Sequence, residues 1–334
     1  MSTEASRLVN NQIEHLQEDA RSYFERSDTA HLHSLLFSAG GKFLRPRLAI
    51  ACSGYGEAQG RRVEWELVRR AALAIELAHM GTLYHDDIVD RSATRRGVPA
   101  VHCRLGTRAA AIGGAHLLAR ANALVARLPD PLPRRWGIAS SRIADGQLRE
   151  IEQVGSFDLA VDSYLSIARR KTATLFELAA FFGGFLGGVP ATDLAVLGRF
   201  AGHLGLAFQL FDDLHDFVSE PATHRYAGSD LRERVYTLPV LYGCARSDPA
   251  GARLRQLLRD DGRPVREDEI NIILDLLAST GAFAAAARRA SEERDLARVS
   301  LLRLRGVTER ESFERLLDLV APPRIPDRGL EKVT

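Results

Sequence analysis

Hydrophobic residues recur along most of the chain at the spacing of helices. Two segments, 64–87 and 194–217, are apolar on every side over much of their length. That pattern is typical of helices buried at the centre of a bundle, because a helix at the surface keeps one polar face. No alternating run of β-branched residues is long enough to predict a strand. We therefore predict an all-α fold, a single-domain helical bundle over residues 1–334 in which residues 322–334 form a frayed tail.

Composition and charge narrow the class of protein. Of the 334 residues, 46% are hydrophobic and 26% are charged, as in an ordinary globular protein. A net charge of +2 provides no overall field that would favour nucleic acid or an anionic membrane. Three widely separated cysteines indicate neither a disulfide framework nor a zinc site and fit a cytoplasmic protein. The longest uncharged apolar stretch, 178–191, is too short to span a membrane, so we expect no stable membrane insertion.

The two apolar segments end in the same acidic pattern. In each, three aspartates stand at positions i, i+1 and i+4 of a helix. They are Asp86, Asp87 and Asp90 in the first segment, and Asp212, Asp213 and Asp216 in the second. Such carboxylates repel one another, and they lie at the negative end of the helix dipole. A single group of this kind is more often a set of solvated surface residues. Two such groups at the ends of buried helices favour a cation-binding site. Ligands that are all carboxylate oxygens indicate Mg²⁺ and hence a phosphorylated substrate.

Basic residues in four segments could bind the anionic part of such a substrate. Arginine matches phosphate oxygens with its planar fork, and lysine supplies a point charge. The residues are Lys42 and Arg45 in GGKFLRPR, Arg95 and Arg96 before Gly97, Lys171 beside Thr172, and Arg225. Singly, each would more often be a solvated side chain. The chain has no GxxxxGK[ST] or GxGxxG sequence, so nucleotide-binding folds have no support.

The order of these motifs resembles the trans-isoprenyl diphosphate synthases. The resemblance spans roughly residues 35–245 and rests on GGKFLRP, ELAHMGTLYHDDIVD, RRG, KT, FQLFDDLHD, GSDLR and TLP. It implies the isoprenoid synthase fold, with a central apolar cavity, usually in a homodimer. It also implies an enzyme that condenses isopentenyl diphosphate with an allylic prenyl diphosphate. In that family metal ions assist ionisation of the allylic diphosphate, and the double bond of isopentenyl diphosphate attacks the resulting cation.

The resemblance also assigns roles to single residues. The six aspartates would bind Mg²⁺, with three ions expected. Arg95, Lys171 and Arg225 would surround the allylic diphosphate, and Thr172 and Gln209 would present dipoles to the developing cation. The diphosphate of isopentenyl diphosphate would be held by Lys42, Arg45, His79 and Arg96. For His79 and Gln209, the motif around them is what favours this role over that of a polar residue inside a helix bundle.

Residues one turn before the first aspartates are expected to control product length. Gly81 and Thr82 share the helix face of Asp86 one turn earlier. In the family, bulky aromatic residues at this level stop growth at short products, whereas these two are small. Leu77, on the next turn, is a candidate for the floor of the cavity. We therefore predict a product longer than farnesyl diphosphate, either geranylgeranyl diphosphate or a longer polyprenyl diphosphate.

Several positions depart from the family pattern and leave two alternatives open. Ala115 stands where an aspartate is expected, Arg225 replaces a lysine, and Arg234 and Val235 replace a Gly-Lys pair. One alternative is a class I terpene cyclase-like member that acts on a preformed prenyl diphosphate. The other is a non-catalytic partner subunit of a prenyl diphosphate synthase. The basic residues expected to hold isopentenyl diphosphate favour the synthase over the cyclase, and the six aspartates favour it over the partner subunit.

Overall fold

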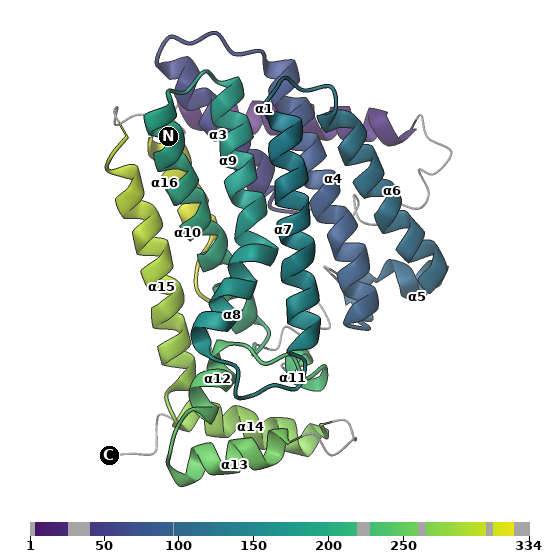
Figure 1. The fold of residues 1–334 in the computed structure, drawn as a ribbon, viewed down its shortest axis with the longest axis vertical. Coiled ribbons are helices and arrows are strands. Elements are labelled where there is room, and N and C mark those ends of the chain that lie inside the picture. The colour runs from purple at the N-terminus through teal and green to yellow at the C-terminus, as the bar shows by residue number, and fades with distance from the viewer. Residues whose placement is uncertain are drawn as a thin grey trace. The chain divides into compact units, whose positions relative to one another are not determined.

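The computed structural model describes residues 4–25, 41–95, 97–218, 228–259, 265–304 and 310–323. Nearly all regular structure in these ranges is helical, so the all-α prediction is confirmed (Figure 1). The first helices are α1 (Glu4–Glu25), α3 (Leu44–Ala58), α4 (Trp65–Val89), α5 (Val101–Leu105), α6 (Thr107–Val125) and α7 (Leu132–Glu152). Next come α8 (Val161–Ala168), the π-helical turn η1 (Arg169–Ala173), α9 (Thr174–Leu186) and α10 (Ala191–His215). The last are α11 (Ser229–Arg232), α12 (Leu238–Cys244), α13 (Pro249–Leu258), α14 (Glu267–Ser279), α15 (Ala282–Leu301) and α16 (Arg310–Leu319).

A short β-hairpin follows α4 and was not predicted. Strands β1 (Thr94–Arg95) and β2 (Val98–Pro99) pair in antiparallel fashion, with Thr94 opposite Pro99 and Arg95 opposite Val98. Strands of two residues are too short to produce an alternating pattern in the sequence. Only the geometry of the chain after the first aspartates shows that Arg95 is held on a strand.

The chain divides into two compact units. Unit 1 comprises Met1–Ser140, Leu175–Ala201 and Ala297–Leu319, and unit 2 comprises Ser141–Thr174, Gly202–Leu296 and Val320–Thr334. The single-domain organisation therefore stays a prediction. Of the predicted frayed tail, only residues 322 and 323 fall within the described ranges.

The two segments expected to be most buried form α4 and α10. Residues 71–78 of α4 are all buried, including the charged Glu76. In unit 2, α10 buries a run of leucines, among them Leu204, Leu206 and Leu210. By length and composition alone α10 could cross a membrane, and it is the one such single helix in the described part of the chain. However, 56% of its most apolar window is buried inside the protein, as in a core helix. Continuous hydrophobicity in these helices therefore reflects burial on all sides.

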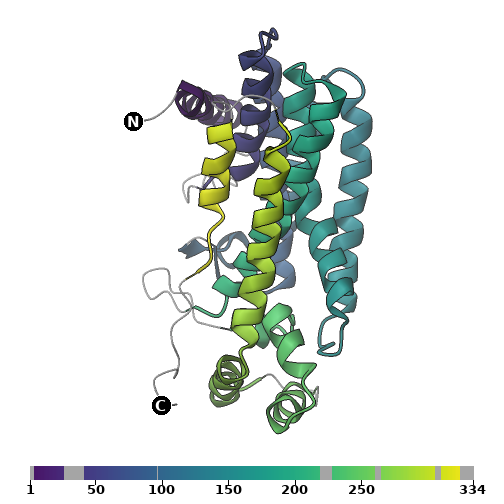
Figure 2. The same cartoon turned by 90° about the vertical axis from the view of Figure 1, so that its left-hand side faces the viewer.

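Within unit 1, α4 packs most extensively against α6, and the two helices lie side by side in Figure 1. Two glycines allow this close approach. A Cβ atom on Gly81 would lie 2.9 Å from the carbonyl oxygen of Gly114 and 3.0 Å from Cγ of Leu118. His85 adds a polar link, because its Nε2 lies 3.1 Å from the carbonyl oxygen of Ala111. Helices α1 and α16 pack on α3 in the same unit (Figure 2).

Helices α3 and α9 of unit 1 touch through their backbones. A Cβ atom on Gly183 of α9 would lie 1.9 Å from the carbonyl oxygen of Ala49, and one on Gly187 would lie 2.7 Å from Cα of Ser53. The Ser53 hydroxyl donates to the carbonyl oxygen of Gly183 at 2.8 Å. No side-chain layer separates the two helices at these positions, so their spacing is set by main-chain contact.

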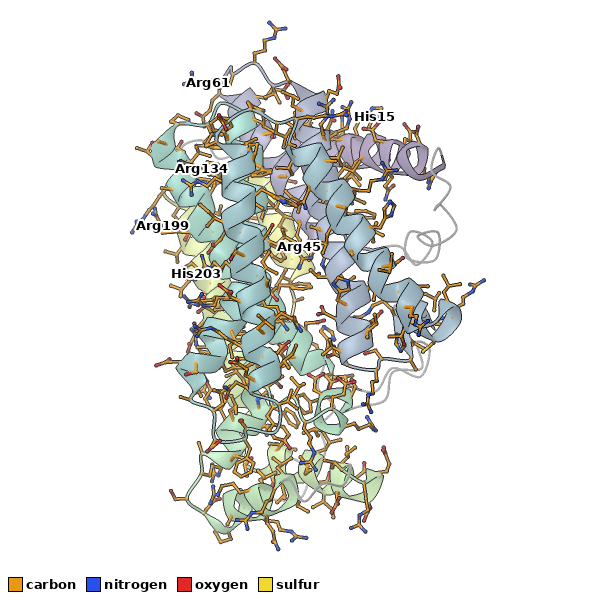
Figure 3. All side chains as sticks on the ribbon, turned by 45° about the vertical axis from the view of Figure 1, so that its right-hand side comes forward. His15, Arg45, Arg61, Arg134, Arg199 and His203 are labelled. Carbon is orange, nitrogen blue, oxygen red and sulfur yellow. The ribbon has the colours of Figure 1, made fainter. Side chains whose placement is uncertain are left out.

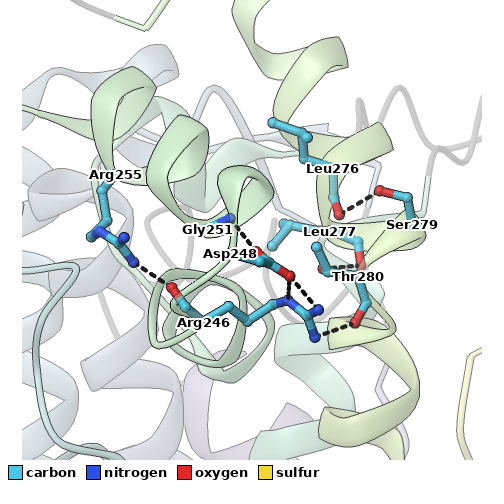
Figure 4. A network of polar contacts seen from close by, with 8 residues as sticks. All are labelled: Arg246, Asp248, Gly251, Arg255, Leu276, Leu277, Ser279 and Thr280. Carbon is cyan, nitrogen blue, oxygen red and sulfur yellow. Dashed lines mark hydrogen bonds and ion pairs between the residues drawn. The ribbon is translucent and has the colours of Figure 1, made fainter.

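In unit 2, a polar network fixes the corner between α12, α13 and α14 (Figure 4). Asp248 caps the start of α13 by accepting from the backbone N–H of Gly251 at 2.9 Å, which satisfies a free donor of the first turn. Arg246 donates to the same carboxylate and to the carbonyl oxygen of Thr280, at the end of α14. Arg255 of α13 donates to the carbonyl oxygen of Arg246 at 2.8 Å. One arginine therefore joins the start of one helix to the end of another.

We predict that Gly183→Ala destabilises the protein. The added methyl group would collide with the backbone of α3, and such overpacking costs about 1–3 kcal/mol. Gly198→Ala is the matched control, because Gly198 is also helical but a Cβ atom there would have no neighbour within 4 Å. That control should gain about 0.5–1 kcal/mol from its higher helix propensity. Urea unfolding of both variants measures the difference, and equal stabilities would contradict the backbone contact.

Candidate active site

The first acidic group lies where α4 ends. The backbone N–H of Asp90 donates to the carbonyl oxygen of Asp86 at 2.8 Å, so the helix ends at the last of the three aspartates. Asp87 is buried, with 1% of its surface exposed. Arg95 of β1 donates to its Oδ1 through Nε at 2.8 Å and also through Nη2. The hairpin therefore turns a basic side chain back onto the acidic end of the helix that precedes it.

The negative charge of Asp87 is only partly compensated by the basic side chains around it. Burial raises the pKa of this carboxyl, and the charge and hydrogen bonds of Arg95 together with His102 offset that effect only in part. Its other oxygen, Oδ2, is buried and has no hydrogen-bond partner among the described residues. The same carboxylate, with burial, raises the pKa of Tyr84. A further cation at Oδ2 would complete the coordination of this group.

The basic residues expected at the second diphosphate differ in their surroundings. Arg45 of α3 is buried (Figure 3). Its guanidinium lies 4.7 Å from the ring centroid of Phe176 on α9. Lys42 is exposed and donates from Nζ to the carbonyl oxygen of Leu319, the last residue of α16, at 3.2 Å. His79 is half-buried on α4, and its carbonyl oxygen accepts from the Thr82 hydroxyl at 2.8 Å. Of these groups, Arg45 is the one whose position is fixed by aromatic stacking.

The second acidic group, in unit 2, is more deeply buried than the first. Asp213 and Asp216 are 7% and 2% exposed, whereas Asp212 is exposed. Gln209 donates to Oδ1 of Asp213 at 2.8 Å, and the Tyr164 hydroxyl donates to Oδ2. Asp216 accepts from the hydroxyl of Ser229 and, at 3.1 Å, from the backbone N–H of Asp230. Neutral donors orient these carboxylates but do not cancel their charge.

Asp230 is a further acid at this site, which sequence reasoning did not single out. Burial and the charges of Asp216, Asp213 and other acids raise its pKa well above the usual range. The pKa of Asp213 is likewise raised, by burial and by Glu150 and Asp216. The signal for Asp230 was the GSDLR segment, which carried the resemblance without a role for its aspartate. Unit 2 thus gathers more negative charge at the end of α10 than its three aspartates alone supply.

The π-helical turn η1 presents Lys171 and Thr172 to the same region of unit 2. Lys171 donates from Nζ to Glu150 of α7 at 2.5 Å. The Thr172 hydroxyl donates to Oε1 of Gln209 at 2.5 Å, which extends the chain of hydrogen bonds to Asp213. Turns of this kind occur frequently at functional sites. The sequence-predicted residues Lys171, Thr172, Gln209 and Asp213 are therefore brought together, and Glu150 and Tyr164 join them without having been predicted.

Other predicted residues are not gathered in this way. Arg96 and Arg225 lie outside the described residues. Arg234, which stands where the family has glycine, adopts a left-handed conformation with φ of 59°. Its guanidinium donates to the carbonyl oxygen of Leu258 at 3.5 Å, at the end of α13. That side chain is thus engaged in joining α11 to α13 within unit 2.

The predicted apolar cavity between the central helices stays a prediction. Unit 2 has an open groove of about 810 Å³ between the end of α7 and α8. Its lining includes Asp145, Arg149, Glu152 and Asp162, so it is a charged groove and not the predicted apolar cavity.

The acidic groups suit a hard divalent cation. Among the described residues, no group of three or more His, Cys, Asp or Glu side chains is arranged to hold a metal ion. Mg²⁺ does not need such a cage, because it is usually bound by one or two carboxylates together with substrate phosphates and water. The unpartnered Oδ2 of Asp87 and the raised pKa of Asp213 show carboxylates that a cation would stabilise. The donor set therefore fits Mg²⁺ in company with a phosphorylated substrate.

Comparison with known proteins decides the family. The sequence model of the polyprenyl synthetase family matches residues 29–277. The chain belongs to the polyprenyl synthetase family. Nonaprenyl diphosphate synthase of Mycobacterium tuberculosis is 34% identical over 285 residues, which cover 85% of this chain and 83% of that protein. Octaprenyl diphosphate synthase of Escherichia coli is 30% identical over 284 residues, which cover 83% of this chain and 84% of that protein.

Solved structures of the polyprenyl synthetase family agree with this assignment. A polyprenyl synthase from Caulobacter crescentus, complexed with calcium and isoprenyl diphosphate, has a TM-score of 0.86 at 30% identity. The match covers 95% of this chain and 96% of that one. The predicted isoprenoid synthase fold is thereby confirmed.

We predict that Asp230→Asn raises the stability of the metal-free protein at neutral pH. A carboxyl whose pKa is raised on folding stabilises the folded state fully below its ordinary pKa, and this contribution is lost as the pH rises through the folded pKa. The gain should appear as a higher free energy of unfolding for Asp230→Asn than for the wild type. Stability should also fall less between about pH 5 and about pH 8 than in the wild type.

Urea unfolding in a chelating buffer measures this effect. Asp318→Asn is the matched control, because Asp318 is an exposed acid on α16. Added Mg²⁺ should stabilise the wild type more at the higher pH, since metal and protons compete for the same oxygens. If the free energy of unfolding had the same pH dependence in the wild type and in Asp230→Asn, then the charge of Asp230 would not destabilise the folded protein.

Proposed function

We propose that the protein is a Mg²⁺-dependent prenyltransferase that condenses isopentenyl diphosphate with an allylic prenyl diphosphate. The observation that carries this proposal is the hydrogen-bonded series Thr172–Gln209–Asp213, which begins beside Lys171 and ends in the buried acidic group. It places hydroxyl and amide dipoles next to carboxylates that suit a metal ion. That combination serves a reaction in which a diphosphate leaves and a carbocation forms.

Each part of this arrangement has a chemical task. The six aspartates would hold Mg²⁺, with three ions carried over from the family, and the metal would supply charge that stabilises the departing diphosphate. Lys171 would exchange its bond with Glu150 for diphosphate oxygens. The Thr172 hydroxyl oxygen and the Gln209 carbonyl would face the allylic cation with their negative ends. After attack by the double bond of isopentenyl diphosphate, the released diphosphate would take the proton that is lost.

The basic residues of unit 1 support a second anionic substrate. We assign Lys42, Arg45, His79 and Arg96 to the diphosphate of isopentenyl diphosphate, and Arg95 and Arg225 to the allylic diphosphate. Arg45 supports this assignment because stacking on Phe176 holds its guanidinium in place and lowers the entropy lost on binding an anion. Arg95 already pairs with Asp87, so cation binding at Asp87 would release its fork for phosphate oxygens.

Two alternatives rest on less support. A cyclase-like member would act on a preformed prenyl diphosphate without isopentenyl diphosphate, and a partner subunit would have no turnover of its own. The named relatives are synthases, and in unit 2 Thr172, Gln209 and Asp213 form the hydrogen-bonded series on which the proposal rests. We therefore place the protein with the synthases.

We further propose that the synthase acts in the cytoplasm as a homodimer. In unit 1, Ile112 of α6 and Ile138 of α7 are 71% and 64% exposed, although both are large and apolar. A second copy covering these side chains would remove their apolar surface from water.

For the product we propose geranylgeranyl diphosphate or a longer polyprenyl diphosphate, in keeping with the octaprenyl and nonaprenyl names of the relatives. Thr82 is half-buried and Leu77 is fully buried on α4. We propose that Thr82 lies beside the growing chain and that Leu77 forms the floor of the cavity. Gly81 is less informative as a test position. A bulky residue there would meet the backbone of Gly114 on α6, so its substitution would report on helix packing as well as on chain length.

We predict that Thr82→Phe shortens the product by at least one isoprene unit, because the ring would occupy space used by the growing chain. Thr82→Ala is the control, since it removes the hydrogen bond to the His79 carbonyl without adding bulk. Reversed-phase chromatography with mass spectrometry measures the products of both variants. An unchanged chain length in Thr82→Phe would mean that this residue does not face the prenyl chain.

The reaction itself is tested with purified protein, Mg²⁺, isopentenyl diphosphate and a set of allylic primers. We expect primer elongation that stops when the metal is chelated. Consumption of a primer without isopentenyl diphosphate would identify a cyclase, and the absence of turnover with every primer would identify a partner subunit. Gln209→Leu should lower kcat about 100-fold, the scale of one transition-state dipole, while the protein stays folded.

A further inference from the structure

Unit 2 contains a buried carboxylate that the proposed reaction does not use. Glu293 of α15 has no exposed surface and accepts hydrogen bonds from three side chains. Nη2 of Arg169 lies 3.0 Å from its Oε1, Nη2 of Arg289 lies 2.5 Å from the same oxygen, and Nδ1 of His203 lies 2.6 Å from Oε2. The donors come from three elements, η1, α15 and α10, so Glu293 joins structures that are distant in sequence.

This carboxylate is fully compensated, unlike those at the end of α10. Burial raises the pKa of Glu293, but its hydrogen bonds with His203 and Arg289 and their charges outweigh that effect and lower it below the usual range. Ion pairs of this kind add little net stability, because removing both charges from water is costly. They do, however, fix the positions of the donor side chains, because the buried carboxylate keeps its hydrogen bonds only while each donor stays in place.

The two long-range donors lead directly to the candidate active site. Arg169 is the first residue of η1, two residues before Lys171 and three before Thr172. His203 lies on α10 (Figure 3). It stands six residues before Gln209, which corresponds to about 9 Å along the helix axis. Glu293 therefore binds both η1 and α10. The same two elements are also joined by the hydrogen bond from Thr172 to Gln209. These two cross-links brace one element against the other.

The turn held in this way needs support from outside. A π-helical turn is rare and is found mainly as a single turn inside longer helices, as η1 is between α8 and α9. The backbone of α7 also approaches η1 closely, because a Cβ atom on Gly146 would lie 2.7 Å from the backbone nitrogen of Lys171. Glu150, one turn after Gly146, binds the Lys171 side chain. The ion pair from Arg169 to Glu293 is the matching contact with α15.

We propose that Glu293 is a positioning residue for the reaction, which holds η1 through Arg169 and α10 through His203 so that Lys171, Thr172 and Gln209 keep their mutual geometry. This inference rests on the proposed function for its effect on turnover, and on contacts within unit 2 alone for its structural part. Loss of the Arg169 link should let η1 shift, and misplacement of a catalytic group by about 1 Å can reduce the rate about 100-fold.

Arg169→Met tests the link most cleanly. It removes the bridge between η1 and Glu293 but leaves the carboxylate with its bonds from His203 and Arg289. We expect kcat to fall about 10- to 100-fold with a smaller change in KM for isopentenyl diphosphate. Arg169→Lys, which can still reach the carboxylate with one donor, should recover part of the loss and covers the case in which the methionine variant folds poorly.

Arg289→Met is the matched control. It removes a bond to the same oxygen, but Arg289 lies one turn away on α15 itself and does not reach η1. Its kcat should stay close to that of the wild type, even if urea unfolding shows a loss of stability similar to that of Arg169→Met. Equal kcat in the two variants, or a loss of kcat that merely follows stability, would overturn the positioning role.

Hydrogen exchange separates this inference from the proposed function. In Arg169→Met the backbone amides of η1 should exchange faster than in the wild type, while in Arg289→Met they should not. If the wild type shows no turnover with any primer, the proposed function fails, and exchange alone decides whether Glu293 holds the turn. Unchanged exchange in Arg169→Met would overturn the inference whatever the activity.

Discussion

Negative charge buried at the end of α10 is the constraint on which the rest of the structure depends. Asp213 and Asp216 are almost fully buried, Asp230 joins them, and Glu150 approaches from α7. Neutral donors can orient such carboxylates, but they do not offset the unfavourable free energy of removing several like charges from water. The folded chain therefore holds a cluster of buried acids whose charge a bound cation would balance.

The same unit shows a second way to bury a carboxylate. Glu293 is surrounded by Arg169, His203 and Arg289 and needs nothing from outside the protein. Basic side chains of the fold therefore compensate the charge of Glu293, whereas the donors described for Asp213 and Asp216 are neutral. The contrast lies in the partners of these carboxylates, because Glu293, Asp213 and Asp216 are all buried.

Much of the fold could be predicted from the sequence, because long apolar helices and repeated acidic spacing are local patterns. The segments 64–87 and 194–217 form α4 and α10 with nearly the expected bounds. The aspartates were found because i, i+1, i+4 spacing is readable along the chain, and Lys171, Thr172 and Gln209 because motifs surround them. Glu150, Tyr164 and Glu293 could not be found this way, since their contacts join residues far apart in sequence. The hairpin that carries Arg95 was not predicted, because its two-residue strands are too short to produce an alternating pattern in the sequence.

The backbone contact between α3 and α9 has a consequence for the guanidinium of Arg45. Arg45 lies one turn before Ala49 on α3, and Phe176 lies two turns before Gly183 on α9, so the stacked pair and the touching backbones belong to one helix interface. No side-chain layer separates the two helices at this contact, so their spacing is fixed. That spacing in turn fixes the position of the Arg45 guanidinium. Enlarging Gly183 would then move the guanidinium of Arg45, and with it the proposed site for an anion.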